Sequence, residues 1–559
     1  MLLVDRPPRS ASSPPPIDVS SSATSPCHWP FYLDTPDSRP IPLRWTLAAG
    51  CPGGRMRRCR LSKEILEQRK AKIETLRKRG VEPYGRPFKP THGSAEILEG
   101  ASELEQAGAK VSVAGRLMSR RGHGKAAFGH IQDRSGRIQV YFKQDLLGEE
   151  AYAVCRLLDV GDIVGVEGTV FRTRTGEITV SAAAVHLLAK ALRPLPEKWH
   201  GLRDVEIRAR QRYLDLIANE EARAVAIKRS LVTNSIRTFL DSEGYLEVET
   251  PVLQPIYGGA FANPFETFHS TLDEKLYLRI ADELYLKRLI VGGLERVYEI
   301  GKDFRNEGMD RLHNPEFTQV EFYEAYADYN RMMEVVENLV SFVAAAVTGG
   351  RTTVYGDETI DFTPPWKRVK ILDCVSEACG TDVSRAGPEE LKDICKSRGV
   401  EFKEPVGWAK LIEVLFDALV QDTLVQPTFV MDYPRELSPL AKSKSDDPRL
   451  VERFEAFAGG LELGNAFSEQ NDPEEQLKAF ERQGELRRLG DMEAQVTDKD
   501  YVTALEYGMP PTGGVGMGID RLVMLITGAT NIREVILFPH MRRVAPDGET
   551  EAEEEGGDG

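Results

Sequence analysis

Residues 304–307 read Phe304-Arg305-Asn306-Glu307, and residues 313–317 read His313-Asn314-Pro315-Glu316-Phe317. This polar stretch lies between two strand-like runs, at 298–304 and 319–325. An arginine fork can bind a carboxylate and a phosphate oxygen at once, and Phe317 offers a face for an adenine ring. Glu321 and Tyr323 are two residues apart, so the strand period places both on one face. The stretch therefore predicts a strand–loop–strand unit that holds ATP together with an acid.

The surrounding sequence, to about residue 543, predicts one large mixed domain. Gly244 ends its first helix, and Pro251 ends the strand that follows, because proline lacks the N–H that a strand ladder needs. The expected elements are a helix at 222–242, strands at 245–250 and 461–469, a glycine-rich turn at 513–518 and a helix that begins at 522–526.

The N-terminal half shows the element order of an OB-fold. A basic helix at 62–79, capped by Ser62, is followed by five β-type runs, with a helix at 149–157 between the third and the fourth. This order favours an OB barrel over other small β-barrels, and interleaved basic and aromatic residues support it. The two prolines of Leu192-Arg193-Pro194-Leu195-Pro196 predict a stiff linker. The β-type runs are 111–118, 128–133, 137–142, 163–171 and 178–187.

Composition limits the class of protein. The net charge of -15 does not favour a general polyanion binder, so a nucleic-acid role needs a local basic surface. The seven cysteines form no C-x-x-C pair, and no apolar run reaches the ~20 residues that span a bilayer. We expect a cytoplasmic protein without a membrane segment. Residues 1–60 are expected to be a disordered extension, a transit peptide or the product of a misassigned start before Met56; residues 544–559 are expected to be a disordered acidic tail.

The sequence lacks the motif of one common class of ATP-binding site. No G-x-x-x-x-G-K-[ST] loop is present, so a P-loop is not supported. Lys442-Ser443-Lys444-Ser445 is weakly similar to the lysine–serine loop of class I synthetases, but no His-Gly-His element precedes it, and we interpret it as a chance match.

The segments 298–308 and 311–318 closely resemble motif 2 of bacterial-type class II lysyl-tRNA synthetases. Gly513-Gly514-Val515-Gly516-Met517-Gly518-Ile519-Asp520-Arg521 resembles motif 3, and 222–251 resembles motif 1, which forms the dimer interface of the class. The resemblance covers roughly residues 62–543. It implies an α+β protein with an N-terminal helix and OB-fold anticodon-binding domain (61–190), a linker (191–205) and a class II catalytic domain (206–543) on an antiparallel sheet flanked by helices.

The implied activity is that of a lysine–tRNA ligase, a homodimer that uses ATP and Mg²⁺. It forms lysyl-adenylate and pyrophosphate, then transfers lysine to the 3′ end of its tRNA. Lysine carries two ammonium groups and one carboxylate, so its pocket needs at least two carboxylates and one arginine. An unmatched buried charge would cost about 3–5 kcal/mol.

The resemblance also implies roles for single residues. Arg305 binds the substrate carboxylate and the α-phosphate; Glu283, with the backbone at Gly259, receives the α-ammonium. Glu469 and Tyr323 receive the ε-ammonium, and Glu321 and Asn465 line the same pocket. ATP is contacted by Arg305, Glu307, His313, Phe317, Gly518 and Arg521, of which Arg305, Glu307 and Arg521 are catalytic.

Two further sets of residues follow from the resemblance. Glu455 and Glu462 match the pair that holds magnesium, although their spacing alone indicates an ordinary acidic strand edge. Phe128 stacks on an anticodon base, while Arg120, Gln139 and Glu177 contact the anticodon. Without the resemblance, Phe128 is about as well explained as barrel core.

The chain departs from the family pattern at Asn263, where arginine is frequent, and at Ala466, where glycine is frequent; both are expected beside the pocket. Aspartyl and asparaginyl enzymes share the architecture, but their motif 2 differs after Phe304-Arg305. The nearest rival function is that of a paralogue that attaches lysine to a protein, but such paralogues generally lack the anticodon domain. A catalytically silent regulatory or nucleic-acid-binding homologue is a second rival. The residues that argue against it are the retained Arg305, Glu307, Glu455, Glu462 and Arg521.

Overall fold

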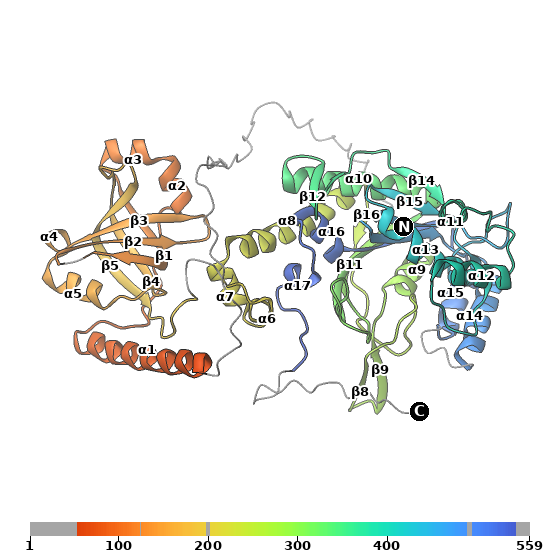
Figure 1. Cartoon of the computed structure of the whole chain (residues 1–559), viewed down its shortest axis with the longest axis horizontal. Helices are drawn as coiled ribbons and strands as arrows, with labels where there is room; N and C mark the ends of the chain where they lie inside the picture. Colours follow the sequence, from red (N-terminus) through yellow and green to blue (C-terminus); the bar gives the residue numbers. More distant parts are fainter. Residues whose placement is uncertain (1–52, 123, 197–201, 489–494, 544–559) are drawn as a thin grey trace, which may run out of the picture. The chain divides into compact units, whose positions relative to one another are not determined.

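The structure is a computed structural model that describes residues 53–122, 124–196, 202–488 and 495–543, with side chains from residue 63 onward (Figure 1). The predicted acidic tail and most of the predicted N-terminal extension lie outside the described residues. Within the described ranges, no helix is both long enough and apolar enough to cross a membrane.

Helix α1 (Gly53–Lys78) contains the predicted basic helix but begins earlier, so Ser62 lies inside it and is not its cap. Ile73 and Leu76 are buried. Arg69 donates hydrogen bonds to the backbone oxygens of Ala191 and Val160, at 2.8 and 3.1 Å. The C-terminal turns of α1 are therefore part of the barrel domain. The short helices α2 (Ser94–Glu99) and α3 (Ala101–Ala107) precede the first strand.

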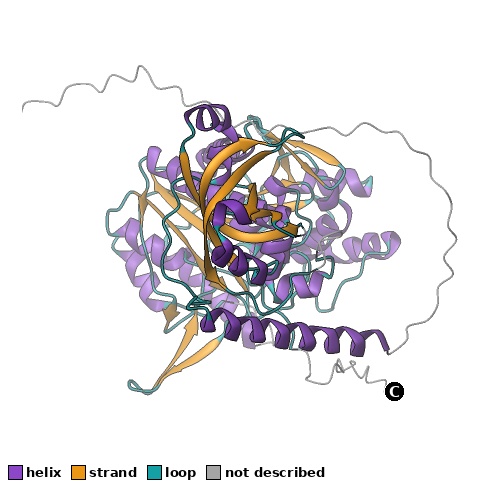
Figure 2. Ribbon diagram, turned by 90° about the vertical axis from the view of Figure 1, so that its left-hand side faces the viewer, coloured by secondary structure: helices purple, strands orange, loops and turns teal. Residues whose placement is uncertain are grey.

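The N-terminal domain is a closed five-stranded barrel of order β1-β2-β3-β5-β4, whose strands curve round one another in Figure 2. β3 and β5 pair in parallel, and the other pairs are antiparallel. Every predicted β-type run lies within an observed strand except for Asp133, so the predicted OB order is confirmed. The elements are β1 (Lys110–Arg121), β2 (Ala126–Gln132), β3 (Arg137–Lys143), α4 (Gln144–Leu147), α5 (Glu149–Leu157), β4 (Ile163–Arg172) and β5 (Ile178–Ala189).

The C-terminal domain is built on an eight-stranded mixed sheet. The six middle strands are antiparallel as predicted, but the edge pairs β14–β15 and β10–β6 are parallel. β6 is shorter than the predicted strand at 245–250, because only two of its residues pair with β10. The sheet order is β14 (Lys367–Lys370), β15 (Thr428–Met431), β16 (Arg453–Ala458), β17 (Leu461–Ser468), β18 (Thr512–Gly518), β11 (Glu316–Ala325), β10 (Arg296–Phe304) and β6 (Leu246–Glu247).

One face of this sheet packs in the main core, and the other lines a cavity. On β11, Val320 and Phe322 point into the main core, which includes residues of α8 (Glu220–Ser242), α10 (Tyr329–Thr348) and α16 (Ile519–Thr527). Glu321 and Tyr323 line a cavity on the other face, so the prediction that they share a face is confirmed. Helix α9 (Glu283–Val291) contacts β11 and β10.

The sequence predicts a turn for the glycine-rich segment, and that prediction is wrong. The segment forms β18, an inner strand between β17 and β11. Its residues alternate: Val515 and Met517 are buried in the main core, while Gly514, Gly516 and Gly518 line the cavity. Glycine on that face leaves room for side chains from the neighbouring strands.

The remaining elements surround the sheet. A three-stranded sheet has the order β7-β9-β8, β12 and β13 form a hairpin, and α11 and α13 contribute to a separate apolar cluster. The bounds are α6 (Val205–Arg210), α7 (Arg212–Ala218), β7 (Leu253–Gln254), β8 (Glu266–His269), β9 (Glu274–Leu278), β12 (Thr352–Tyr355), β13 (Glu358–Asp361), α11 (Ile371–Cys379), α12 (Pro388–Arg398), α13 (Trp408–Leu419), α14 (Pro473–Arg488), α15 (Lys499–Glu506) and α17 (Ile532–Val535).

Candidate active site

A cavity of about 370 Å³ opens on the sheet face that carries Glu321. It is lined from β11, β17 and β18, from the loop after β10 and from the start of α9. The predicted substrate, ATP and metal residues that line it are Gly259, Glu283, Arg305, Glu307, His313, Phe317, Glu321, Tyr323, Glu462, Asn465, Glu469, Gly518 and Arg521. Glu455 is not among the lining residues. The fold thus brings together side chains that are more than 250 positions apart (259 and 521).

One end of the cavity is acidic and buried. Glu283 and Glu469 both reach the ammonium of Lys287, which is fully buried. Glu283 Oε1 lies 2.5 Å from Lys287 Nζ, one helical turn away on α9. Glu469 Oε1 is buried, lines the cavity and accepts no hydrogen bond from a described residue. This end therefore presents an unsatisfied carboxylate oxygen to a ligand.

Glu321 forms the middle of this acidic end. Its Oε1 accepts hydrogen bonds from Gln319 Nε2 at 2.6 Å and from the Asp282 backbone N–H at 3.2 Å. Its Oε2 accepts from the Tyr323 hydroxyl at 3.1 Å. Burial, reinforced by the charges of Asp303 and Glu283, raises the pKa of Glu321 to about 8. An arriving cation would favour the ionised form.

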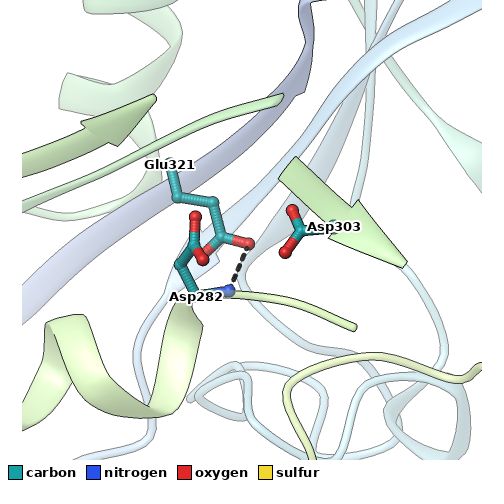
Figure 3. A group of neighbouring side chains, drawn as sticks. All are labelled: Asp282, Asp303 and Glu321. Carbon is teal, nitrogen blue, oxygen red and sulfur yellow. Dashed lines mark hydrogen bonds between the residues drawn. The ribbon is translucent and has the colours of Figure 1, made fainter. Parts of the chain in front are cut away.

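Glu321 forms a cluster of buried acids with Asp282 and Asp303 (Figure 3). Arg279 is their counter-ion: its Nη1 lies 2.7 Å from Asp282 and 2.5 Å from Glu299, and its Nε lies 3.3 Å from Asp303. Burial, and then the charge of Asp303, raise the pKa of Asp282 to about 10. The Arg279 guanidinium is thus shared by the three acids Asp282, Glu299 and Asp303.

Arg305 leaves the end of β10 and points to the cavity. Its guanidinium lies 5.0 Å from the centroid of the Phe317 ring, and its Nε donates to the Ile280 oxygen at 3.4 Å. Among the described residues, no carboxylate lies within salt-bridge distance of Arg305. The cavity therefore contains a cation that an anionic ligand can bind.

Arg521 lines the other end of the cavity. This residue lies near the start of α16, and its Nη1 donates to the Glu462 backbone oxygen at 2.9 Å and lies 3.1 Å from Glu462 Oε2. Its Nη2 lies 3.1 Å from His313 Nε2. Because a guanidinium only donates, His313 Nε2 accepts, which leaves the proton on Nδ1 for Asp310 at 2.8 Å. The Arg521 guanidinium and the His313 ring thus give this end of the cavity groups that can bind phosphate.

Glu455 lies behind Arg453 on β16. Arg453 contacts Glu455 Oε1 at 2.5 Å and donates to Asn465 Oδ1 at 2.9 Å. The Tyr433 hydroxyl donates to Glu455 Oε2 at 2.8 Å. Burial raises the pKa of Glu455 to about 7; Arg453 opposes this, and the charge of Glu462 adds to it. Glu455 and Glu462 are thus close enough to repel each other, which a divalent cation would relieve.

Comparison with known proteins identifies the family to which this chain belongs. The family described as tRNA synthetases class II (D, K and N) matches residues 204–542, and the OB-fold nucleic acid binding domain matches 111–188. A lysine–tRNA ligase of Carboxydothermus hydrogenoformans is 53% identical over 86% of this chain and 98% of its own length. The lysine–tRNA ligase of Bacillus subtilis is 50% identical, over 86% and 97%. The chain belongs to the class II lysine–tRNA ligase family. The predicted family and fold class are therefore confirmed.

The barrel of this synthetase carries the predicted anticodon residues on its surface. Phe128 is 38% exposed, and its ring contacts that of Tyr141 in a tilted arrangement with the centroids 4.6 Å apart, so it is not barrel core. Glu177 accepts from Gln139 at 2.6 Å and lies 2.9 Å from His130. Arg120, by contrast, donates to the backbone oxygens of residues 156 and 158. The groups other than Arg120 thus come from β2, β3 and the loop before β5, where Glu177 contacts both Gln139 and His130.

The two departures from the family pattern do not line the cavity of the synthetase. The Asn263 backbone oxygen accepts a hydrogen bond from Asn306 N–H at 2.8 Å and so ties down the loop after β10. Ala466 is fully buried in the main core on the far face of the sheet. The expectation that Ala466 lies beside the pocket is wrong, because Asn465 and Phe467 line the cavity and the side chain between them points to the other face of the strand.

Sequence reasoning missed three residues of the synthetase: Lys287, Arg453 and His130. Lys287 follows Glu283 by four positions in a helix, a spacing that indicates an ion pair. Arg453 and Glu455 are two apart on a strand, which places them on one face. No sequence signal identifies His130, since its partner Glu177 comes from the loop before β5.

Proposed function

We propose that the protein attaches L-lysine to its tRNA in a reaction driven by ATP. The observation that carries this proposal is the acidic end of the cavity, where Glu283, Glu321 and Glu469 surround space for a ligand while Arg305 lies free for a carboxylate. Lysine has the matching charges, with two ammonium groups and one carboxylate. A substrate with an acidic side chain would instead place a negative charge beside Glu469.

In this proposal Glu283 and the backbone at Gly259 receive the α-ammonium. Glu469 and Tyr323 receive the ε-ammonium, and Glu321 and Asn465 complete the pocket. Gly514 contributes by having no side chain, because a Cβ there would collide with Glu469 and Tyr323. Closely placed charge partners in a buried site are worth more than at a surface, so affinity and selectivity come from the same groups.

ATP would occupy the other end of the cavity. Phe317 offers a ring face to adenine, Glu307 and His313 lie beside it, Gly518 allows close approach, and Arg521 binds the γ-phosphate. Magnesium fits the carboxylates present: Glu462 lines the cavity and Glu455 lies close behind it. When bound, magnesium would neutralise triphosphate charge.

The reaction needs no nucleophilic side chain. Arg305 holds the lysine carboxylate against the α-phosphate, one carboxylate oxygen attacks the α-phosphorus in line, and the bond to pyrophosphate breaks. A ribose hydroxyl at the tRNA 3′ end then attacks the adenylate carbonyl, and AMP leaves. Glu307, Arg305 and Arg521 act by position and charge, which are the main sources of rate enhancement in such steps.

The rest of the chain supplies partner contacts in this proposal. Phe128, Gln139 and Glu177 read the anticodon, and Arg120 helps if it exchanges its backbone contacts for RNA. A homodimer is supported by exposed apolar residues on α8 and β6, where Ile227, Leu231 and Leu246 are 51%, 45% and 52% exposed. We place the enzyme in the cytoplasm, where lysine tRNA and ATP are found.

The proposal is tested by charging purified tRNA with single labelled amino acids. Lysine should appear on lysine tRNA, in a reaction that depends on ATP and magnesium. Aspartate or asparagine on tRNA, lysine on protein alone, or no product at all would each refute it.

A further inference from the structure

Lys287 is the feature that neither the motifs nor the proposed chemistry explain. Its side chain is fully buried, and its Nζ contacts the two carboxylates proposed for opposite ends of the substrate, Glu283 and Glu469. The Phe467 ring covers it, with Nζ 5.2 Å from the centroid. Lys287 does not line the cavity. It is therefore a charge placed under the pocket floor and out of reach of a ligand.

The titratable groups around Lys287 and its two carboxylates come from four parts of the chain. Glu283 lies on α9, Glu321 and Tyr323 on β11, Glu469 directly after β17, and Tyr501 on α15. Burial lowers the pKa of Lys287, but Glu283 and Glu469 more than offset this, so its pKa is raised and the ammonium stays charged. The pocket contains three carboxyl groups, and Lys287 compensates one negative charge before any ligand arrives.

We propose that Lys287 is a positioning and specificity residue: a fixed ammonium that aims Glu283 and Glu469 and matches one of the three negative charges that the pocket carries once all its carboxyls are ionised. When Glu321 loses its proton on lysine binding, the other two charges equal the two ammonium groups of lysine, so the filled pocket is neutral. An amino acid with an uncharged side chain brings no donor to the buried Glu469 Oε1, and it is disfavoured on that ground. The inference rests on the proposed function, because it takes lysine as the substrate.

The geometry also explains why one residue serves both carboxylates. Glu283 and Lys287 are one helical turn apart on α9, while Glu469 follows β17, where its backbone N–H donates to the Thr512 oxygen at 2.8 Å. Lys287 thus joins a helix to the sheet at the pocket. One Glu283 oxygen and one Glu469 oxygen are committed to Nζ, and Glu469 Oε1 remains for the ligand.

The test uses the full-length enzyme and lysine-dependent ATP–pyrophosphate exchange. For Lys287→Met we expect the KM for lysine to rise about 30-fold or more, as for truncation of a buried charge pair. The KM for ATP should stay within about threefold, because the ATP end is built from other residues. The lysine KM should also depend more steeply on pH than in the unchanged enzyme, since a second carboxyl besides Glu321 must lose its proton when lysine binds.

Lys287→Arg retains the charge and should restore the pH profile of the unchanged enzyme, whereas Lys287→Gln, a neutral polar residue, should behave like Lys287→Met. If Lys287→Met does not fold, the Arg and Gln variants make the same comparison. Equal changes in the KM values for lysine and ATP, or a pH profile like that of the unchanged enzyme, would overturn the inference. If the unchanged enzyme does not activate lysine, the proposed function fails instead.

Discussion

Tyr323 and Gly514 are direct partners across β11 and β18, and the tyrosine ring covers the glycine. The Glu469 carboxylate shares the same space. Two proposed lysine contacts therefore depend on the absence of a side chain at position 514. The glycines of this strand serve the amino-acid pocket as well as the nucleotide.

Gly514→Ala should displace Tyr323 and Glu469 and greatly reduce lysine activation. Overpacking of this kind also costs about 1–3 kcal/mol of folding free energy. Pyrophosphate exchange at saturating ATP measures activity, and thermal unfolding measures stability. Gly484→Ala is the matched control, because a Cβ at position 484 meets no atom within 4 Å. Normal lysine KM in Gly514→Ala would contradict the pocket geometry.

Arg305→Ala should reduce ATP–pyrophosphate exchange by about 10²–10³-fold or more, the usual effect of removing one donor that stabilises developing charge. The loss should appear both in kcat and as a higher KM for lysine, since Arg305 is proposed to hold the substrate carboxylate as well as the α-phosphate. Arg305→Lys should recover only part of the rate, because lysine lacks the planar fork. Near-normal exchange in Arg305→Ala would refute the proposed role.

Lysine binding should release protons near neutral pH. The pKa of Glu321, raised to about 8, means that the free enzyme holds this proton until a substrate ammonium arrives. Calorimetric titration in two buffers of different ionisation heat counts the protons. Glu321→Gln should lower that count, and buffer-independent heats in the unchanged enzyme would contradict the prediction.

The same shift predicts how the stability of the free enzyme depends on pH. The pKa of Glu321 is higher in the folded state than its ordinary value of 4.5, so the unfolded chain loses this proton first as the pH rises. The contribution of Glu321 to the free energy of unfolding should therefore fall from about pH 4.5 to about pH 8 and level off above. Denaturant titrations of the unchanged enzyme and of Glu321→Gln across this pH range isolate the contribution of Glu321.

Glu462→Gln should raise the magnesium concentration required for half-maximal pyrophosphate exchange. The carboxylate lines the cavity beside Arg521, and loss of its charge weakens a hard-cation site. The KM for lysine should change little. Glu401→Gln, at an exposed acid outside the cavity, is the control. An unchanged magnesium requirement would argue against Glu462 as a ligand.

Phe128→Ala should lower the charging of tRNA by about 5- to 150-fold, the range for loss of one stacked base. Pyrophosphate exchange without tRNA should be unaffected, because the first step uses only the cavity. Tyr84→Ala removes another exposed aromatic ring from the same domain and should leave charging intact. Equal loss of exchange and charging in Phe128→Ala would indicate misfolding rather than a lost contact.

Local sequence predicts most of the fold. The barrel strands and the strands on both sides of Arg305 follow from apolar alternation and turn residues, which act over a few positions. The glycine-rich strand is the exception, because glycine is common in turns and its local pattern therefore predicts one. In β18 the same residues are required by Tyr323 and Glu469, which lie more than 40 positions away in the chain.

The sequence by itself determined the family, the two-domain order and the charges needed at the site, because motif spacing and strand period are local properties. Tertiary structure alone decided how those charges are shared. Burial raises the pKa of Glu321, Arg453 engages Glu455, and Lys287 lies between Glu283 and Glu469. These relationships depend on desolvation and on contacts between distant strands and helices, and neither quantity is present in the order of residues.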